Sequence, residues 1–206
     1  KFLAISILAT FIVLFFSKFV GSLFILITVW VYYFFRDPER YSINDDSYLV
    51  SPADGLITDI SEKSGPEELR LENTTFTKIS VFMNVFNCHV NRIPSSGKVE
   101  EIYYKPGKFL NASLDKASEE NERNYFKIKL SNGEDIIIVQ IAGLIARRIV
   151  CEVEQGQELK QGERIGMIRF GSRVDIYFKN KKVLAKLGQN VVAGESILAS
   201  EWWKKI

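Results

Sequence analysis

Hydrophobic and polar residues are distributed very unevenly along this chain. Between Phe2 and Phe35 the only charged residue is Lys18, and two apolar runs, Phe2–Phe16 and Phe19–Phe35, lie on either side of the Ser17-Lys18 pair. At about 1.5 Å per residue each run makes a helix of roughly 23–26 Å, slightly shorter than the ~30 Å hydrocarbon core of a bilayer. We therefore expect residues 1–36 to associate with a membrane. A hydrophobic helical hairpin is preferred over one long span in which Lys18 reaches the surface.

Beyond Arg36 the pattern changes to short runs of β-branched and aromatic residues bounded by Gly, Pro, Asn and Ser. Such runs are typical of β-strands. The chain therefore predicts a mainly β domain over residues 37–206, a sandwich or partial barrel. The expected strands are Gly55–Ile60, Thr77–Met83, Lys98–Tyr104, Tyr125–Leu130, Ile136–Ile141, Ile149–Glu154, Arg164–Arg169 and Val174–Phe178, and Leu114–Glu122 could form a short helix.

A ten-residue pattern occurs twice in the second half of the chain. Gly156–Ile165 recurs as Gly188–Ile197, and each copy reads as a turn, a short strand, a second glycine turn and another strand. The pattern is similar to the half-motifs of biotinyl/lipoyl-type β-sandwiches, in which two such halves face each other. A repeat of this kind serves mainly to pack supersecondary units against each other, so it predicts the fold and not the chemistry.

Charge and cysteine content exclude several classes of function. The first 36 residues contain three of the 27 basic residues and none of the 25 acidic ones, so the rest of the chain is nearly neutral. A nucleic-acid-binding protein would normally carry a basic face, so no nucleic-acid partner is expected. Cys88 and Cys151 lack C-x-x-C spacing and His89 is the single histidine. We expect two reduced thiols and no metal site.

Three residues could carry chemistry, although each alone has an ordinary structural explanation. Asp54 lies in a turn-forming segment, His89 is a lone histidine, and Ser172 follows Gly171 in what could be a corner between strands. Together they could supply a nucleophile, a base and a group that holds the base. The chain has no G-x-S-x-G motif and no parallel-sheet pattern, which argues against an ordinary serine hydrolase.

Several stretches together make the chain resemble the short form of the phosphatidylserine decarboxylase proenzyme family. Besides the apolar N-terminus they are Phe34–Arg40, Ser51–Gly55, Cys88–Pro94, Asn121–Arg123, Gln140–Gly143 and Gly162–Asp175. The resemblance implies a proenzyme that cuts itself between Gly171 and Ser172. The products would be a β chain (1–171) and an α chain (172–206) that remain associated. The mature enzyme would convert phosphatidylserine to phosphatidylethanolamine and CO₂.

The resemblance also implies a pyruvoyl cofactor made from Ser172. The Ser172 hydroxyl would attack the carbonyl carbon of Gly171, with His89, held by Asp54, taking the hydroxyl proton. Elimination of the resulting ester and hydrolysis would leave the pyruvoyl group. Its ketone would form a Schiff base with the serine amine of the lipid and accept the electrons released as CO₂ departs.

One position departs from longer relatives of that family, which carry a second histidine where this chain has Arg92. If that second histidine is the base for self-cleavage in those relatives, His89 or another group would have to take its place in this chain. Candidates for binding the lipid carboxylate or phosphate are Arg92, Arg147 and Arg148. The expected partners are a phospholipid substrate and a membrane, and the expected location is the cell membrane with the catalytic domain on the cytoplasmic face. A homodimer is left open.

Two other functions fit parts of the sequence. A membrane-tethered biotinyl-like carrier would need an exposed lysine beside methionine, and no Met-Lys-Met sequence lies between the two repeat copies. A pyruvoyl decarboxylase of a soluble amino acid would have no need of the apolar N-terminus.

Overall fold

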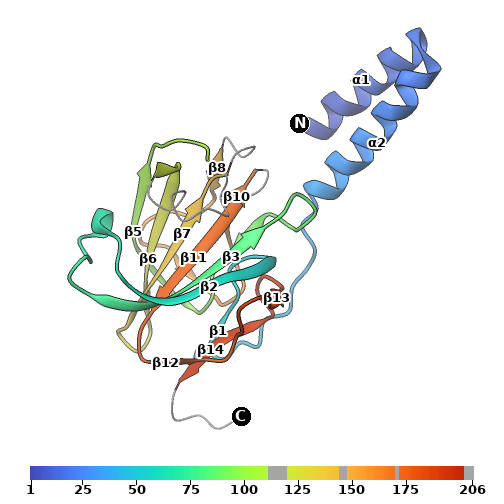
Figure 1. Cartoon of the computed structure of the whole chain (residues 1–206). Helices are drawn as coiled ribbons and strands as arrows, with labels where there is room; N and C mark the ends of the chain where they lie inside the picture. The colour runs from blue at the N-terminus through green and yellow to red at the C-terminus, as the bar shows by residue number, and fades with distance from the viewer. Residues whose placement is uncertain (111–119, 144–147, 170–171, 202–206) are drawn as a thin grey trace. The chain divides into compact units, whose positions relative to one another are not determined.

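A computed structural model describes residues 1–110, 120–143, 148–169 and 172–201. The chain divides into two compact units, Lys1–Pro38 and Glu39–Ile206. The first unit is helical, and the regular elements described in the second are β-strands apart from one short 3₁₀ turn (Figure 1). The prediction of a mainly β protein preceded by helices is therefore confirmed.

The helical unit contains α1 (Phe2–Phe16) and α2 (Lys18–Phe34), separated by one residue, Ser17. The extended backbone of Ser17 ends α1, and its hydroxyl accepts the Val20 N–H at the start of α2. The helices contact each other through Thr10, whose Oγ1 lies 2.8 Å from Thr28 Oγ1. Many of the large apolar side chains point outward, and Phe15 and Phe19 are each 86% exposed. No helix among the described residues combines the length and apolarity needed to cross a membrane.

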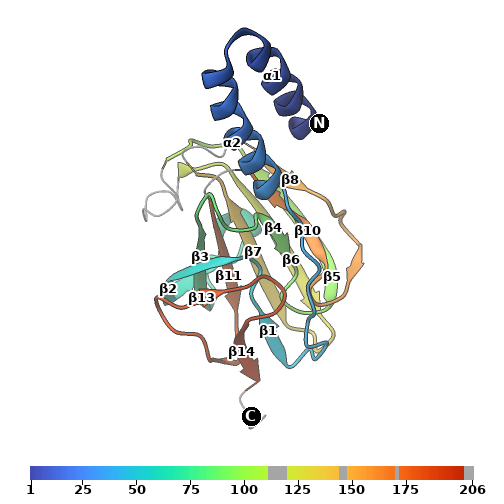
Figure 2. The same cartoon turned by 90° about the vertical axis from the view of Figure 1, so that its right-hand side faces the viewer.

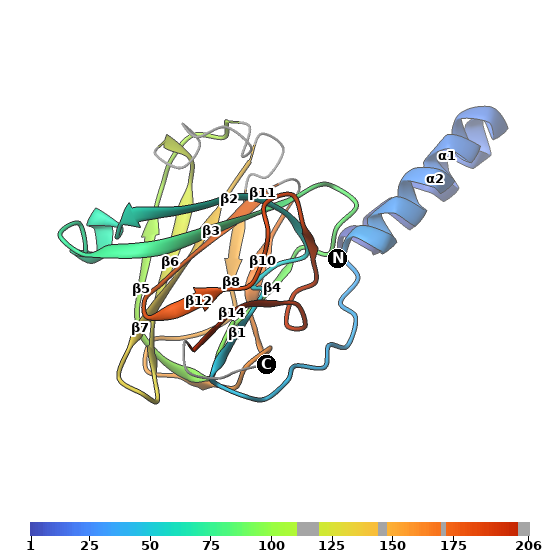
Figure 3. The same cartoon turned by 60° about the horizontal axis from the view of Figure 1, so that its bottom comes forward.

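The β unit is built on one antiparallel eight-stranded sheet in the order β13-β2-β3-β11-β7-β6-β5-β9. Two three-stranded sheets, β1-β14-β12 and β4-β10-β8, complete it. The large sheet twists and curls strongly, so that β2 and β3 run across the direction of β5 and β6 (Figure 3). The strands are β1 (Tyr48–Val50), β2 (Gly55–Ser64), β3 (Thr75–Met83), β4 (Val90–Arg92), β5 (Gly97–Lys105), β6 (Arg123–Leu130), β7 (Asp135–Ile141), β8 (Ile149–Cys151), β9 (Glu158–Leu159), β10 (Arg164–Ile168), β11 (Ser172–Phe178), β12 (Lys181–Val183), β13 (Asn190–Val191) and β14 (Ile197–Glu201), with one 3₁₀ turn at Glu67–Leu69.

Each of the eight strands expected from runs of β-branched and aromatic residues corresponds to an observed one, and β9, β13 and β14 lie where the repeat predicts strands. The three-residue strands β1, β4 and β12 were not expected. The expected helix Leu114–Glu122 falls mostly outside the described residues. A three-residue strand shows no clear periodicity in a sequence, because a pattern of alternation needs several residues.

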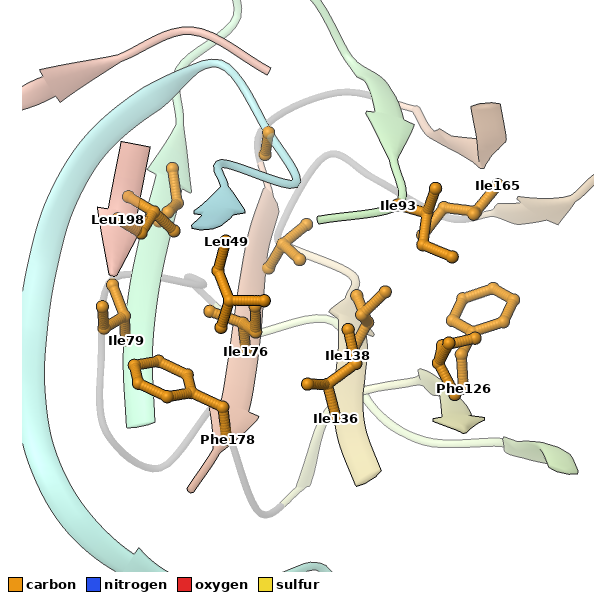
Figure 4. Close-up of a cluster of buried hydrophobic side chains, with 14 of the residues drawn as sticks. Leu49, Ile79, Ile93, Phe126, Ile136, Ile138, Ile165, Ile176, Phe178 and Leu198 are labelled. Atoms are coloured by element: carbon orange, nitrogen blue, oxygen red, sulfur yellow. The ribbon is translucent and has the colours of Figure 1, made fainter. Parts of the chain in front are cut away.

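Both faces of the central strands are buried. One face carries the main core, in which Ile79, Ile176, Ile138 and Phe126 lie side by side across β3, β11, β7 and β6 (Figure 4). The opposite face carries a smaller cluster around Phe76, Tyr125, Ile137, Val139 and Ile141. Burial on both sides explains why β7 reads as a continuous apolar run and not as an alternating pattern.

The two copies of the repeat make equivalent backbone contacts. Gly156 N–H donates to Val99 O at 2.7 Å, and Gly188 N–H donates to Ile57 O at 2.9 Å. Both glycines have positive φ angles (+91° and +78°), a conformation that glycine adopts without strain. The short strand of the first copy, β9, pairs with β5, and that of the second, β13, pairs with β2. Later strands of the two copies, β10 and β14, belong to the two small sheets, and Figure 2 shows β14 beside β1.

Candidate active site

Ser172 is the first residue of β11, the strand that lies between β3 and β7 in the large sheet. It pairs with Met83 at the end of β3, and both residues are completely buried. Within the described part of the chain, the Ser172 hydroxyl has no hydrogen-bond partner. A buried polar group without a partner is uncommon and marks a position of chemical interest. Gly171, the residue expected on the other side of the cleaved bond, lies outside the described residues.

His89 is also completely buried and lies directly before β4. Its Nδ1 lies 3.0 Å from the carbonyl oxygen of Asn87. Because a carbonyl can only accept, Nδ1 must carry the proton in this hydrogen bond, and in a neutral imidazole Nε2 is then the basic nitrogen. The backbone oxygen of His89 accepts the N–H of Ile168, the last residue of β10. A backbone hydrogen bond therefore joins His89 to β10, the strand that ends four residues before Ser172.

A tight turn connects Met83, which pairs with Ser172, to His89. In this turn Asn84 N–H donates to Asn87 Oδ1 at 2.9 Å, and Asn87 N–H donates to Asn84 O at 3.0 Å. The Asn84 side chain closes the turn further by accepting the Phe86 N–H at 2.8 Å. These local bonds favour a fixed turn over a mobile loop. The turn follows directly after Met83, so it links the strand opposite Ser172 to the segment that carries His89.

Asp54 does not bond to His89; it accepts hydrogen bonds from two other groups. Arg40 Nη2 donates to its two oxygens at 2.9 and 3.2 Å, and the Ala193 N–H donates to Oδ1 at 2.8 Å. Among the described residues no hydrogen bond joins Asp54 to His89. The repeat explains the contact with Ala193. Its counterpart in the first copy, Gln161, donates its N–H to the hydroxyl of Ser96 at 3.1 Å, and Ser96 directly precedes β5 as Asp54 directly precedes β2. Accepting this N–H therefore does not require a carboxylate.

The three arginines expected to bind the lipid carboxylate or phosphate have different positions. Arg92 is buried and donates to the carbonyl oxygen of Gly162 at 2.9 Å. It lines a pocket of about 590 Å³ together with Arg40 and Arg164, and neither Ser172 nor His89 is among the lining residues. Arg148 is exposed, and its carbonyl accepts the Arg169 N–H. Arg147 lies outside the described residues.

Sequence reasoning missed the polar residues that lie on the core face beside Ser172. The buried amides of Asn91, Gln140 and Asn124 are hydrogen-bonded to one another. One signal was available, since Gln140 interrupts the apolar run Ile136–Ile141. The Asn87 carbonyl could not have been identified, because every residue carries a carbonyl. No group of three or more His, Cys, Asp or Glu side chains within the described ranges is arranged to hold a metal ion.

Comparison with known proteins shows the family. The family model for phosphatidylserine decarboxylase matches residues 27–199. A protein from Pelagibacter ubique (strain HTCC1062), named phosphatidylserine decarboxylase proenzyme, is 64% identical over 98% of this chain and 94% of its own length. This chain belongs to the phosphatidylserine decarboxylase family.

Other relatives with the same name are similar over nearly the whole chain. The protein from Ruegeria pomeroyi is 50% identical over 97% of this chain and 91% of its own length. The protein from Rickettsia akari is 48% identical over 100% of this chain and 89% of its own length. Membership of the phosphatidylserine decarboxylase family confirms the resemblance that the sequence motifs indicated.

Proposed function

We propose that this chain is a self-processing phosphatidylserine decarboxylase that converts phosphatidylserine to phosphatidylethanolamine and CO₂. Membership of the family and the proenzyme names of its relatives support the reaction. The observation that carries the proposal is Ser172 itself, a completely buried hydroxyl without a partner among the described residues, at the first position of a central strand. The family match does not favour the carrier or the soluble amino-acid decarboxylase.

Self-cleavage would occur between Gly171 and Ser172. Ser172 Oγ attacks the Gly171 carbonyl carbon while His89 Nε2 takes the hydroxyl proton, and the peptide C–N bond then breaks to leave an ester. The hydrogen bond from Nδ1 to the Asn87 carbonyl supports His89 as the base, because it fixes the ring and its tautomer. Asp54 would act as a positioning residue that holds the Ser51–Gly55 segment against Ala193 and Arg40.

The pyruvoyl group would form at residue 172 after cleavage. The site fits such a group, because the hydroxyl that is lost makes no hydrogen bond within the described residues, so its loss leaves no described group without a partner. When present, the group supplies a conjugated carbonyl that accepts the electrons released in decarboxylation. Buried side chains around this position exclude water from it: Met83 of β3, Val174 of β11 and Ala142, which directly follows β7.

The two chains should remain associated after the cut. Residues 172–206 contain β11, which pairs with β3 over seven residues and with β7 over five. They also contain β13, which pairs with β2, and β14, which pairs with β1. Removing this segment would take the central strand out of the large sheet. The backbone hydrogen bonds and the shared core therefore oppose dissociation.

Residues 1–36 would hold the enzyme at the cell membrane as a hydrophobic helical hairpin. Support comes from the exposed apolar side chains of α1 and α2 and from the near absence of charge between Phe2 and Phe35. Attachment would place the site where the lipid resides, so that a search in two dimensions replaces extraction of the lipid into water. We also propose that the two repeat copies are half-motifs of a biotinyl/lipoyl-like sandwich, which their equivalent hydrogen bonds support.

A direct test is release of labelled CO₂ from phosphatidylserine that carries the label in its serine carboxyl group. The full-length protein should release it in mixed micelles, and prior treatment with a carbonyl reagent should abolish release. Ser172→Ala should be inactive and remain uncut. Release by Ser172→Ala at the wild-type rate would exclude the proposed function.

A further inference from the structure

Three amide side chains form a hydrogen-bonded chain on the core face of the large sheet. Asn124 Nδ2 donates to Gln140 Oε1 at 3.3 Å, and Gln140 Nε2 donates to Asn91 Oδ1 at 2.8 Å. Asn91 and Gln140 are completely buried and Asn124 is 2% exposed. Two residues from Gln140 and Asn124 along β7 and β6, the same face carries the apolar side chains of Ile138 and Phe126. Aliphatic side chains would fill the amide positions without the desolvation cost of polar groups, so the amides need an explanation.

The amide group of Asn91 lies over the first residues of β11. Its Nδ2 is 3.6 Å from Met83 Sδ, and Met83 pairs with Ser172 on one side of β11. Its Oδ1 bonds to Gln140, which pairs with Val174 on the other side of β11. Paired side chains point to the same face, and neighbouring strands are about 4.8 Å apart. A side chain that contacts both neighbours of β11 must cross β11 beside Ser172.

Two polar groups are incompletely satisfied at this position. A primary amide nitrogen has two N–H donors, and the acceptor that Asn91 Nδ2 has is a thioether sulfur, which accepts only weakly. The Ser172 hydroxyl, on the same face, has no partner among the described residues. Catalytic hydrogen bonds are often long before the reacting geometry forms, so a donor that lies over the first residues of β11 and an acceptor on that strand can meet during the reaction.

We propose that Asn91 is a catalytic residue of self-cleavage that donates an Nδ2–H to Ser172 Oγ. The proposal rests on self-processing at Gly171–Ser172. As Oγ bonds to the Gly171 carbonyl carbon, its proton passes to His89 Nε2 and the carbonyl π electrons move to the carbonyl oxygen. When that oxygen re-forms its double bond, the C–N bond breaks and the nitrogen of residue 172 takes the proton. The amide N–H stabilises the negative charge that builds on Oγ, and Gln140 is the positioning residue that holds Asn91 over β11.

The first test is Asn91→Asp in the full-length protein. The substitution keeps an oxygen that can accept from Gln140 but removes the N–H donors. Proenzyme is made in a short cell-free synthesis, and the appearance of the 172–206 fragment is followed by intact mass. Loss of one donor to a developing oxyanion typically slows a reaction by ~10²–10³-fold. The matched control is Ile138→Val, on the same face two residues from Gln140, which should cleave at the wild-type rate.

The second test separates a donor to Oγ from a purely structural effect. A thiol ionises near pH 8.5 and needs much less help than a hydroxyl. In a Ser172→Cys background, Asn91→Asp should therefore slow cleavage by less than about tenfold, whereas a structural defect would slow both backgrounds equally. If Asn91→Asp fails to fold, the triple variant Asn91→Leu/Gln140→Leu/Asn124→Leu replaces all three amides with apolar groups and is compared in the same two backgrounds.

Two results would overturn the assignment of Asn91. One is wild-type cleavage by the folded Asn91 variant, and the other is equal slowing in the wild-type and Ser172→Cys backgrounds. A wild-type protein that stays uncut would instead refute self-processing itself, so failure of this inference and failure of the proposed function are distinguishable.

Discussion

Replacing Asp54 with alanine removes two sets of hydrogen bonds at once. The bond from the Ala193 N–H is worth about 1 kcal/mol net. The ion pair with Arg40 joins side chains that are only 12% and 15% exposed. Its loss should cost more than the ~0–1 kcal/mol of surface pairs and less than the ~3–5 kcal/mol of fully buried ones. We therefore expect Asp54→Ala to lower the free energy of unfolding by about 3 kcal/mol.

More conservative substitutions separate the two contributions. Asp54→Asn keeps an oxygen for the Ala193 N–H and loses the charge that faces Arg40, so its expected cost is about 1–2 kcal/mol. Asp54→Ser introduces the side chain that Ser96, the counterpart of Asp54 before β5, uses to accept the Gln161 N–H. This variant should keep the hydrogen bond from the Ala193 N–H. Arg40→Met is the matched partner variant, because it removes the cation and leaves Asp54 bonded to Ala193. Its cost should be close to that of Asp54→Asn.

Unfolding by urea in detergent, followed by circular dichroism, measures these costs. It is done in a Ser172→Ala background so that the chain stays uncut, and cleavage rates are measured separately with Ser172 present. A positioning role for Asp54 predicts that cleavage slows in step with lost stability and that Arg40→Met resembles Asp54→Asn. The reasoning is refuted if Asp54→Asn blocks cleavage at nearly full stability while Arg40→Met cleaves normally, because Asp54 would then act on His89 directly.

Three further predictions address the base, the acid stability and the membrane segment. His89→Ala should accumulate uncut proenzyme, with cleavage ~10²–10⁴-fold slower by intact mass, and normal cleavage would remove His89 as the base. Burial opposes ionisation of Glu68, but hydrogen bonding from Lys105 and the charge of Arg123 outweigh it and hold the Glu68 pKa below its usual 4.5. The stabilisation from ionised Glu68 is therefore complete above pH 4.5 and is lost as the pH falls through the lowered pKa of the folded state. Glu68→Gln should therefore make the melting temperature depend less on pH on the acid side. An unchanged acid slope would contradict this prediction. Deleting residues 1–35 should leave Ser172 cleavage largely intact and reduce activity on vesicles far more than on a short-chain lipid; loss of cleavage would mean that these residues support folding of the β unit.

The strands that the sequence predicts are those whose side chains are buried over many residues. β7 and β11 are covered on both faces, so Ile136–Ile141 is apolar except for Gln140 and Val174–Phe178 is apolar except for Asp175. Strands β1 and β4 are only three residues long, and their pairing with β14 and β10 depends on contacts distant in sequence. Local patterns contain no information on such pairing.

The candidate site was predictable in its residue types but not in its contacts. His89 could be selected because it is the single histidine, and Ser172 because Gly171-Ser172 lies where the resemblance to the family implies the cleavage site. The partner of Asp54 could not be foreseen, because Arg40 and Ala193 reach it from opposite ends of the chain. The position of Asn91 follows only from the order of β3, β11 and β7 in the sheet. Which polar residues meet is decided by sheet topology, whereas the motifs identify only the chemistry available.

The intact mass of the purified full-length protein tests self-processing most directly. The account predicts two chains, residues 1–171 and 172–206, with the smaller one lacking a free amine at its first residue and carrying a ketone in place of the Ser172 amine and hydroxyl. Amine-directed sequencing of that chain should be blocked, and Ser172→Ala should give one uncut mass. A single intact wild-type chain that still decarboxylates phosphatidylserine would contradict the account.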